Sequence, residues 1–311
     1  MCLFRLENLS VPRIVFADFV WDNLREVNLP IGRGPEYRTE AMHEKKYPLV
    51  SQNRDSRFVN LRFLQTPQGR SRSGLFLIEG IRHVARSVEQ HAAIESVFVD
   101  LSLLSSPFGQ KLARRLRRSG VPGIRLAPQL YRELTLASEP QGIGAVVRQN
   151  WTSLSSLQPK KQSLWLAVEA IDSAGNLGTI IRTAEAAGVA GIFILDLETD
   201  PYDPATVRAT MGSIFSQKLI RCSTQAFAEW AKTLGVSIVS SSPAGLLDYK
   251  ALCCRWPVAL VVGNEKRGIS NNIIEVSDFT VRISMRGRSD SINVAVATGV
   301  LLFEMSSQCP R

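Results

Sequence analysis

Short, uninterrupted apolar runs in the second half of the chain constrain its fold more than any other feature. The clearest is Val258–Val262, in which five successive residues are apolar. Such a run is typical of a strand buried on both faces of a parallel sheet, and parallel strands need crossover connections that are usually helices. Helical patterns do lie between the runs, so the second half is predicted to be an α/β domain. The predicted strands are Leu164–Val168, Ile192–Leu195, Val236–Val239, Val258–Val262 and Thr280–Ile283, and the predicted helices are Leu177–Gly188, Gln225–Leu234 and Asn293–Met305.

A smaller set of alternating strands and helices precedes this domain, which indicates a second α/β domain over residues 51–149. Residues 150–163 contain Ser, Gln, Pro and Lys with little apolar pattern, and we expect a linker there. Residues 1–50 show weak periodicity broken by Pro and Gly, so we expect a partly ordered extension without an assigned role. The larger α/β domain is expected to span residues 164–311. The elements predicted in the smaller domain are strands Leu75–Ile78, Ser96–Val99, Ile124–Leu126 and Ala145–Val147, helices Glu79–Gln90 and Gln110–Ser119, and a helical turn at Gln129–Leu134.

The positive charge of the chain is concentrated in this smaller domain. The whole chain has 37 Lys and Arg residues against 28 Asp and Glu residues, a formal net charge of +9. Residues 51–150 hold 15 of the basic side chains and only 7 of the acidic ones, so they carry +8 of this surplus. Such a surplus favours contacts with RNA phosphates, and the alternative is a solvated helix face. The residues predicted to bind RNA are Arg114, Arg115, Arg117 and Arg118.

The cysteines and histidines argue against a structural metal site. The chain has five cysteines, an odd number, with no C-x-x-C pair, and its three histidines are not spaced with them as zinc ligands would be. We therefore expect no metal and a reducing, cytoplasmic compartment. The first fifty residues resemble neither a transit peptide nor a secretion signal. No run approaches the roughly 18 apolar residues of a membrane helix, so no membrane partner is expected.

Three polar motifs follow predicted strands, where ligands of such sheets bind. The first runs from Asp172 to Gly188 and places Arg182 on the helix that Asn176 could cap; its plainer interpretation is a surface salt bridge to Glu185. In the second, a strand runs into Gly263, where a ligand could touch bare backbone, and a carboxylate follows at Glu265. An ordinary strand-to-helix turn would look the same.

In the third motif, Ser291 is predicted as the cap, or near the cap, of the last helix, and capping alone would explain it. No G-x-G-x-x-G fingerprint is present, which argues against a Rossmann-type nucleotide enzyme that acts on small molecules. Each motif alone is weak evidence. Their occurrence together and in this order is far more specific.

Together, the motifs resemble those of the SpoU family of RNA ribose 2′-O-methyltransferases, within the SPOUT superfamily. This sequence departs from the family pattern with Ser284 where Pro is usual and Ile292 where Leu is usual. The smaller domain is similar to the family's substrate-binding domain, most clearly at Phe76–Gly80 and Glu139–Ile143. The matching residues of the three motifs are Asn176, Gly178 and Arg182, then Gly263, Asn264, Glu265 and Gly268, then Ile283, Met285, Ser291, Asn293 and Val294.

The resemblance implies methyl transfer from S-adenosylmethionine to a ribose 2′-hydroxyl, catalysed by residues 164–311 of a homodimer whose cofactor lies in a deep trefoil knot. The family assigns removal of the hydroxyl proton to the residue that is Arg182 here. A guanidinium is a poor base, so Arg182 is expected to contact a phosphate or to stabilise the developing alkoxide. The other residues expected to be catalytic are Asn176, Glu265, Ser291 and Asn293, and those expected to line the cofactor site are Leu195, Gly263, Ile283 and Ile292.

Ribosomal RNA is the favoured substrate, because many members that act on tRNA lack a separate N-terminal domain of this kind. Methylation of tRNA is one alternative. A non-catalytic RNA-binding protein that uses only the basic domain is another.

Overall fold

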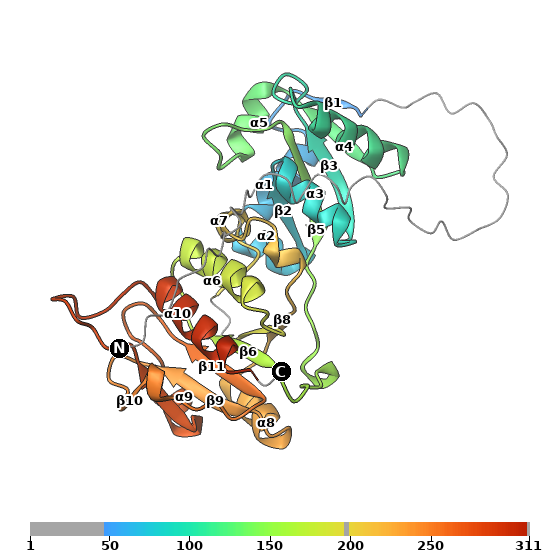
Figure 1. Cartoon of the computed structure of the whole chain (residues 1–311). Coiled ribbons are helices and arrows are strands. Elements are labelled where there is room, and N and C mark those ends of the chain that lie inside the picture. The colour runs from blue at the N-terminus through green and yellow to red at the C-terminus, as the bar shows by residue number, and fades with distance from the viewer. Residues whose placement is uncertain (1–46, 196–198, 310–311) are drawn as a thin grey trace, which may run out of the picture. The chain divides into compact units, whose positions relative to one another are not determined.

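The computed structural model describes residues 47–195 and 199–309 (Figure 1). The expected extension, residues 1–50, therefore lies almost entirely outside the described residues. Two sheets are formed, one of five strands and one of seven. They correspond to the two α/β domains predicted from the alternation of strands and helices.

The five-stranded sheet of the N-terminal domain has the order β1-β4-β3-β5-β2. Strands β1, β4 and β3 are parallel, whereas β5 pairs antiparallel with both β3 and β2. Because β1 belongs to this sheet, the sheet includes residues that precede position 51. The strands are β1 (Leu49–Val50), β2 (Leu75–Glu79), β3 (Ile94–Val99), β4 (Gly123–Leu126) and β5 (Ile143–Arg148).

Helices cover both faces of this sheet and fill two apolar layers. Alternate residues of β2 point to opposite faces, so Leu77 packs with α1 and α5, whereas Phe76 and Ile78 pack with α3 and α4. Two of the five helices, α1 and α2, were not predicted from the sequence. The helices are α1 (Ser56–Leu64), α2 (Pro67–Ser73), α3 (Ile81–Glu89), α4 (Pro107–Arg118) and α5 (Pro128–Leu134).

All seven strands of the C-terminal sheet are parallel, in the order β10-β12-β9-β11-β6-β7-β8. This confirms the parallel α/β fold expected from the apolar runs. Five strands match the predicted ones to within two residues at each end, and the two-residue β10 and three-residue β8 were not predicted. The strands are β6 (Leu164–Val168), β7 (Ile192–Ile194), β8 (Leu219–Arg221), β9 (Ser237–Ser241), β10 (Leu247–Asp248), β11 (Val258–Val262) and β12 (Phe279–Arg282).

The central strand β6 shows why its sequence is apolar throughout. Leu164, Leu166 and Val168 belong to the core layer that includes α6 and α10, whereas Trp165 and Ala167 belong to the layer that includes α8 and α9. Figure 1 shows these two helix pairs on opposite sides of the sheet. A strand covered on both faces needs an apolar residue at every position. The helices are α6 (Ala174–Ala186), α7 (Pro204–Ala209), α8 (Thr224–Thr233), α9 (Asn271–Val276) and α10 (Val294–Ser307).

The stretch expected to be a linker is attached to the C-terminal domain. The N–H of Thr152 donates to the carbonyl of Leu219 in β8, and the neighbouring Trp151 ring lies 4.2 Å from the guanidinium carbon of Arg221. Tyr202 exchanges hydrogen bonds with both backbone groups of Asn150 at 2.9 Å. Residues 150–152 thus lie directly against the C-terminal domain.

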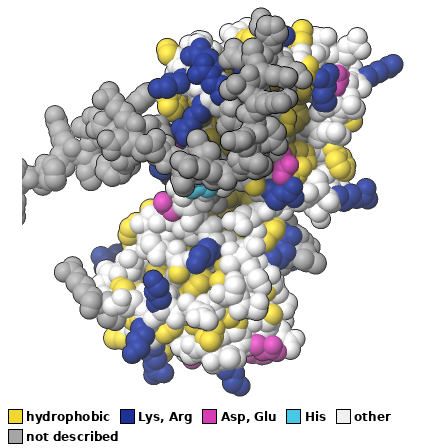
Figure 2. Space-filling model, turned by 90° about the vertical axis from the view of Figure 1, so that its right-hand side faces the viewer, with side chains coloured by type: hydrophobic (Ala, Val, Ile, Leu, Met, Phe, Trp, Pro, Cys, Tyr) yellow, Lys and Arg dark blue, Asp and Glu magenta, His cyan; other side chains and the backbone are white. Residues whose placement is uncertain are grey.

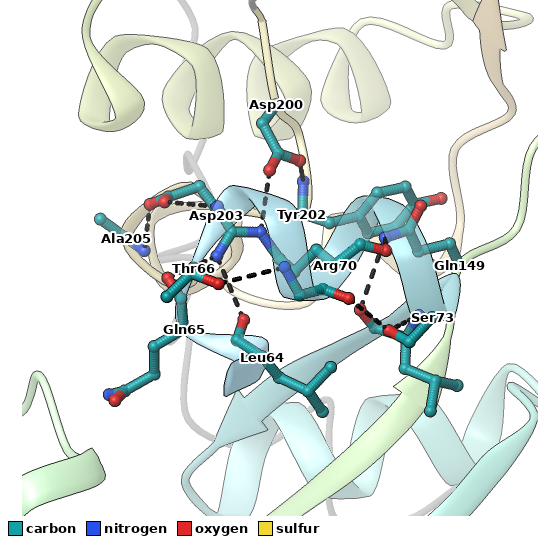
Figure 3. Close-up of polar contacts among 12 residues, drawn as sticks. Leu64, Gln65, Thr66, Arg70, Ser73, Gln149, Asp200, Tyr202, Asp203 and Ala205 are labelled. Carbon is teal, nitrogen blue, oxygen red and sulfur yellow. Dashed lines mark hydrogen bonds and ion pairs between the residues drawn. The ribbon is translucent and has the colours of Figure 1, made fainter. Parts of the chain in front are cut away.

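A buried arginine joins the two domains (Figure 3). Arg70 of α2 is 1% exposed, and its guanidinium donates to carboxylate oxygens of Asp200 at 2.8 Å and Asp203 at 3.1 Å. The same group donates to the carbonyls of Leu64 and Gln65 in its own domain. One side chain therefore satisfies acceptors from both domains, which is the arrangement that allows a buried charge to be tolerated.

Candidate active site

The parallel arrangement brings the polar motifs to one edge of the C-terminal sheet. Strands β6 and β11 are neighbours, and β12 is separated from β11 only by β9. The segments that follow β6, β11 and β12 leave the sheet at the same carboxyl edge, because all three strands run in the same direction. The three motifs begin in these segments.

Glu265 is the centre of a hydrogen-bond network at this edge. Its carboxylate accepts from the side-chain amide of Asn176 at 2.8 Å and from the backbone N–H groups of Asp172 and Ser173 at 3.1 and 3.2 Å. Partial burial raises the pKa of Glu265, but the hydrogen bonds from Asn176 and the backbone outweigh it and hold the pKa below the usual value. An ionised Glu265 therefore joins the loop after β11 to the start of α6.

Asn293 connects the third motif to this network. Its side-chain amide donates to the Asn176 side-chain oxygen at 2.9 Å, while its own side-chain oxygen accepts from the N–H groups of Ala295 and Val296. The contacts form a chain from Asn293 through Asn176 to Glu265. Because each amide donates with its nitrogen and accepts with its oxygen, the chain fixes the orientation of both side chains.

The last helix is capped by Asn293 and not by Ser291. Ser291 is exposed and lies two residues before the N-cap of α10, so it is near the cap without being the cap itself. Serine and asparagine are both favoured at the N-cap, so the sequence alone does not show which of Ser291 and Asn293 is the cap. Ser291 is thereby left without a capping role and stays a predicted contact for the ribose.

Arg182 lies one and a half turns further along α6 and is exposed. Within the part of the chain that the structure describes, its guanidinium forms no ion pair with Glu185, the partner expected if Arg182 were an ordinary surface residue. An exposed guanidinium therefore lies on the same helix as Asn176, and its contact with a substrate stays a prediction.

Two further polar contacts at this edge were not foreseen as site features. Asn264 is only 5% exposed; its side-chain amide donates to the carbonyl of Ala170, and its side-chain oxygen accepts from the N–H groups of Lys266 and Arg267. Glu169 accepts from the hydroxyl and the N–H of Ser270, which caps α9. Asn264 was visible in the second motif, whereas nothing near Glu169 in the sequence marks its partner about a hundred residues away.

The four residues predicted to line the cofactor site follow three strands of the same sheet, or a loop after them. Leu195 follows β7 and is buried, Gly263 follows β11 and is buried, Ile283 follows β12 and is half-buried, and Ile292 is 38% exposed. Because β7, β11 and β12 are parallel, the first three residues lie at the carboxyl edge. They are apolar or bare backbone, which suits the adenosine part of S-adenosylmethionine.

The structure gives another reason for glycine at position 263. A Cβ atom there would lie 2.4 Å from the backbone oxygen of Gly268. The N–H groups of Asn264 and Gly268 each donate to the other residue's carbonyl, so the loop folds back tightly against its own start. Gly263 is thus required by the loop itself, whether or not a ligand touches its backbone.

The departure at Ser284 has a local explanation. Its hydroxyl donates to the carboxylate of Asp248, which follows Leu247 in the edge strand β10. This hydrogen bond is the main reason why the pKa of Asp248 is lowered. A proline at position 284 could not make this contact. The hydroxyl of Ser284 therefore ties the loop after β12 to the sheet edge.

The basic residues of α4 separate into two groups. Arg114, Arg115 and Arg118 are exposed, opposite the buried Leu112 and Leu116, whereas Arg117 is half-buried. Arg117 and Arg114 line a cavity of about 390 Å³ together with residues including Tyr47, Leu101 and Arg125. On the face shown in Figure 2, Lys and Arg side chains outnumber Asp and Glu side chains. Three of the four residues predicted to bind RNA are therefore exposed, and their contact with RNA stays a prediction.

Two features of the described residues bear on other classes of protein. No group of three or more His, Cys, Asp or Glu side chains among residues 47–195 and 199–309 could hold a metal ion. In the same part of the chain, every helix is too short or too polar to cross a membrane.

The fold and the site define the class of α/β proteins that place a polar site beyond the carboxyl ends of a parallel sheet. Comparison with protein families matches residues 163–303 to the SpoU rRNA methylase family and residues 57–145 to an MRM3-like substrate binding domain. The chain is 30% identical over 246 residues to a 23S rRNA (uridine(2479)-2′-O)-methyltransferase of Streptomyces viridochromogenes, which covers 77% of this chain and 85% of the relative. It is 26% identical to a 23S rRNA (guanosine(2553)-2′-O)-methyltransferase of Bacillus subtilis, covering 78% of this chain and 92% of the relative.

Solved structures agree with these relatives. An AdoMet-bound rRNA methyltransferase from Sinorhizobium meliloti, 30% identical, superposes with a TM-score of 0.77 and covers 84% of this chain and 98% of its own. The SpoU methyltransferase AviRb from Streptomyces viridochromogenes, in complex with AdoMet, is also 30% identical, with a TM-score of 0.75 and coverage of 82% and 98%. The protein belongs to the SpoU family of RNA methyltransferases.

Proposed function

We propose that this protein transfers a methyl group from S-adenosylmethionine to a ribose 2′-hydroxyl of 23S ribosomal RNA. The observation that carries the proposal is the chain of hydrogen bonds from Asn293 through Asn176 to Glu265, which unites the three family motifs at one edge of the sheet. Two relatives that span most of the chain carry this activity in their names. The smaller domain matches a substrate binding domain, which supports an RNA substrate recognised away from the reacting atoms.

The reaction asks the protein mainly to position two groups. S-adenosylmethionine supplies a methyl carbon that is already activated on a sulfonium sulfur. The ribose oxygen forms the new bond to that carbon as the carbon–sulfur bond breaks, and the hydroxyl proton must leave. Holding the oxygen in line with the methyl carbon contributes most of what such a site can supply. In our proposal Asn176, Asn293 and Ser291 orient the ribose, and Glu265 holds the two amides in place.

Arg182 is assigned to the charge that develops on the ribose oxygen. A guanidinium is a poor base, because it holds its proton too tightly to accept another group's proton in its place. Its fixed positive charge can instead stabilise the oxygen as the proton leaves, or hold a neighbouring phosphate. The exposed and unpaired state of Arg182 within the described residues supports both contacts.

The cofactor is assigned to the carboxyl edge of β7, β11 and β12. Leu195, Ile283 and Ile292 would pack against its adenosine, and the backbone at Gly263, Ile283 and Ile292 would hydrogen-bond its polar atoms. The deep trefoil knot that the family forms from its last two motifs is part of the proposal. The tight loop between Asn264 and Gly268 lies in the segment that the knot would include.

A homodimer is also part of the proposal, and α10 supports it. Along this helix, Val296 and Phe303 are 55% and 54% exposed, and Val300 between them is half-buried. Spacings of three, four and seven residues place these side chains on one helix face. A second copy of the chain would cover that face. The proposed location is the cytoplasm, in keeping with Cys222, Cys253 and Cys254, which form no disulfide with one another.

The test is methyl transfer to separated RNA species. The protein is incubated with S-adenosylmethionine carrying a labelled methyl group and with purified 23S rRNA, 16S rRNA or tRNA, and the product is digested to nucleosides. Label in a 2′-O-methylnucleoside from 23S rRNA is expected. Label on a base atom would contradict the proposal, and label only in tRNA would favour the tRNA alternative. A protein that binds RNA but shows no calorimetric signal with S-adenosylmethionine would be the non-catalytic alternative.

A further inference from the structure

A cavity of about 360 Å³ lies outside the active site, where the N-terminal domain meets α7. Strand β2, helices α3 and α5, and the segment after α5 line it from one domain, and Pro204, Val207 and Arg208 of α7 line it from the other. Asn176, Arg182, Glu265 and Asn293 are not among its lining residues. The family-like segments around Glu79 and Gln141 do line it, and methyl transfer gives them no role. Its volume is within the range of small-molecule sites.

The polar groups in this cavity are oriented by the protein itself. The Glu79 carboxylate accepts from the hydroxyl of Thr135 and from the N–H of Leu136, so each of its oxygens is fixed and still has a lone pair free. The side-chain oxygen of Gln141 accepts from the N–H of Ile81 at 2.8 Å. Because this contact occupies the side-chain oxygen of Gln141, its amide nitrogen is left to donate to a ligand.

Two buried side chains in the cavity have polar atoms without a protein partner. His83 is 7% exposed and Tyr131 is fully buried, and neither the His83 Nε2 nor the Tyr131 hydroxyl has a hydrogen-bond partner in the described part of the chain. Buried polar atoms are seldom left unpaired, because each costs free energy. Both residues line the cavity, but these two atoms are closed to solvent, so the proposed ligand contacts are made by Glu79 and Gln141.

The cavity mouth combines apolar and cationic side chains. Leu136 and Met211 are 49% and 37% exposed at this mouth, so apolar surface is available there to the face of a planar ligand. Arg82 and Arg208 are exposed at the same site. Apolar walls with adjacent cations suit a stacked base that is attached to a phosphate.

We propose that this cavity binds an unpaired guanine base of the RNA. The inference rests on the proposed RNA substrate and names a second recognition site for it. Guanine alone among the four bases presents two adjacent N–H donors beside a carbonyl acceptor on its Watson–Crick edge. The Glu79 carboxylate can accept both donors, and the Gln141 amide can donate to the carbonyl. Adenine and cytosine each offer one amino group beside acceptors, and uracil offers one N–H between two carbonyls, so none of them matches.

Helix α7 connects this cavity to the catalytic domain. A Cβ atom on Gly178 of α6 would lie 2.4 Å from the carbonyl oxygen of Thr206 and 2.5 Å from the Cβ of Ala209, so α6 and α7 are in direct backbone contact. Val207 and Arg208 of the same short helix line the cavity. A guanine held there would lie against the helix that packs on α6, which carries Asn176 and Arg182.

The binding test uses guanosine 5′-monophosphate (GMP) and the full chain with ¹³C-labelled methionine methyl groups. The chain has five methionines. Met211 lines the cavity and Met285 lies in the third motif near the active site, so their resonances, assigned with Met211→Leu and Met285→Leu, report the two sites separately. Saturating S-adenosylhomocysteine keeps nucleotides out of the proposed cofactor site. Inosine 5′-monophosphate, which lacks only the amino group of guanine, is the matched control ligand.

We expect GMP to shift the Met211 resonance with at least about tenfold tighter affinity than the inosine and adenosine monophosphates. Glu79→Gln should remove this preference, whereas Glu133→Gln, an exposed change on α5 outside the cavity, should retain it. With the wild-type protein alone, equal affinity for GMP and inosine monophosphate would overturn the inference. Shifts of the Met285 resonance without shifts of the Met211 resonance would also overturn it. The experiment includes no methyl transfer. A protein that methylates RNA but ignores GMP would refute only this inference, and one that prefers GMP but transfers no methyl group would refute only the proposed function.

Discussion

At the scale of single residues, Arg182 is the side chain on which the proposed chemistry depends most. A guanidinium presents a planar set of donors, and the proposal gives Arg182 its role through the position of that group. We expect Arg182→Lys to lower kcat for RNA methylation by at least about tenfold, because a lysine cannot make paired contacts with an oxyanion or phosphate. Steady-state kinetics with a 23S rRNA fragment measures this. Turnover near that of the wild type would contradict the assignment, and Glu185→Gln on the same helix is the control.

A change at Glu265 tests the hydrogen-bond chain from Asn293 through Asn176 to Glu265, because in our proposal Glu265 does not touch the reacting atoms. Glu265→Gln replaces one acceptor oxygen with a donor that faces Asn176 or the backbone N–H groups, so Asn176 and Asn293 are no longer held in a fixed orientation. We expect kcat for methylation to fall by about 100-fold, the cost of a slightly misplaced reacting group. Binding of S-adenosylmethionine, measured by calorimetry, should change much less. Full activity of this variant would show that the network does not position the ribose.

The same carboxylate predicts a pH dependence of stability. The pKa of Glu265 is lower in the folded protein than its ordinary value, so its ionised form stabilises the fold. This contribution is complete above the ordinary glutamate pKa of about 4.3 and is lost as the pH falls through the lowered value. Urea unfolding at several pH values should show the wild type more stable than Glu265→Gln at neutral pH, with the difference narrowing below about pH 4. A constant difference at all pH values would contradict this origin.

At the scale of elements, the two glycines in the first turns of α6 differ in their surroundings: one is in close contact with α7 and the other is not. Glycine allows close approach of another backbone, and the structure uses this at Gly178 but not at Gly175. A Cβ on Gly178 would collide with α7, whereas a Cβ on Gly175 would meet nothing closer than 3.8 Å. We expect Gly178→Ala to destabilise the protein by about 1–3 kcal/mol through overpacking. Gly175→Ala should be neutral or stabilising by up to about 1 kcal/mol, and urea unfolding distinguishes the two.

Helix α4 tests the assignment of its charges to RNA. Replacing Arg114, Arg115 and Arg118 with Gln should weaken rRNA binding and reduce the slope of log K against log salt by up to about one unit for each phosphate that is no longer neutralised. Arg117 is left unchanged because it is half-buried and its replacement would disturb the packing. Lys232→Gln on the catalytic domain is the control. An unchanged salt slope in the triple variant would mean that α4 is merely a solvated helix.

Elements with continuous or periodic apolar residues were predictable from the sequence, and elements fixed by single long-range contacts were not. Strand β11 was bounded correctly because every residue in it is buried. Helix α2 has the sequence Pro67–Ser73 without one large apolar residue, and its buried residues are Gly69 and Arg70. Its position depends on the contacts of Arg70 with Asp200 and Asp203, about 130 residues away, and no local pattern reports such a pair. The same is true of the site: its motif residues could be predicted from the sequence, whereas the long-range contact between Glu169 and Ser270 could not.

At the scale of the whole molecule, the two domains are joined by side-chain contacts as well as by the connecting chain. Besides the Arg70 contacts, the ring of Phe76 in β2 lies 4.7 Å from the ring of Tyr202. The same β2 continues into Glu79, and the same segment of the catalytic domain continues into α7, so the junction and the proposed guanine cavity are built from the same elements. The N-terminal domain, which carries the surplus of positive charge, is therefore packed directly against the catalytic domain.

Arg70 is the residue through which this coupling can be tested. Arg70→Met keeps an unbranched apolar stem but leaves the carbonyls of Leu64 and Gln65 and two carboxylates without their donor. Asp200 and Asp203 are 26% and 35% exposed and can be partly rehydrated, so the cost should be below that of a wholly buried broken pair. We expect the free energy of unfolding to fall by about 3 kcal/mol.

The matched control is Arg72→Met, an exposed arginine on the same short helix, which should change the free energy of unfolding by less than about 0.5 kcal/mol. Urea unfolding followed by tryptophan fluorescence measures both variants. If the two domains are coupled through Arg70, its replacement should also separate one cooperative transition into two, because each domain keeps its own sheet and core. A single transition with wild-type stability in Arg70→Met would mean that the two domains do not depend on this contact.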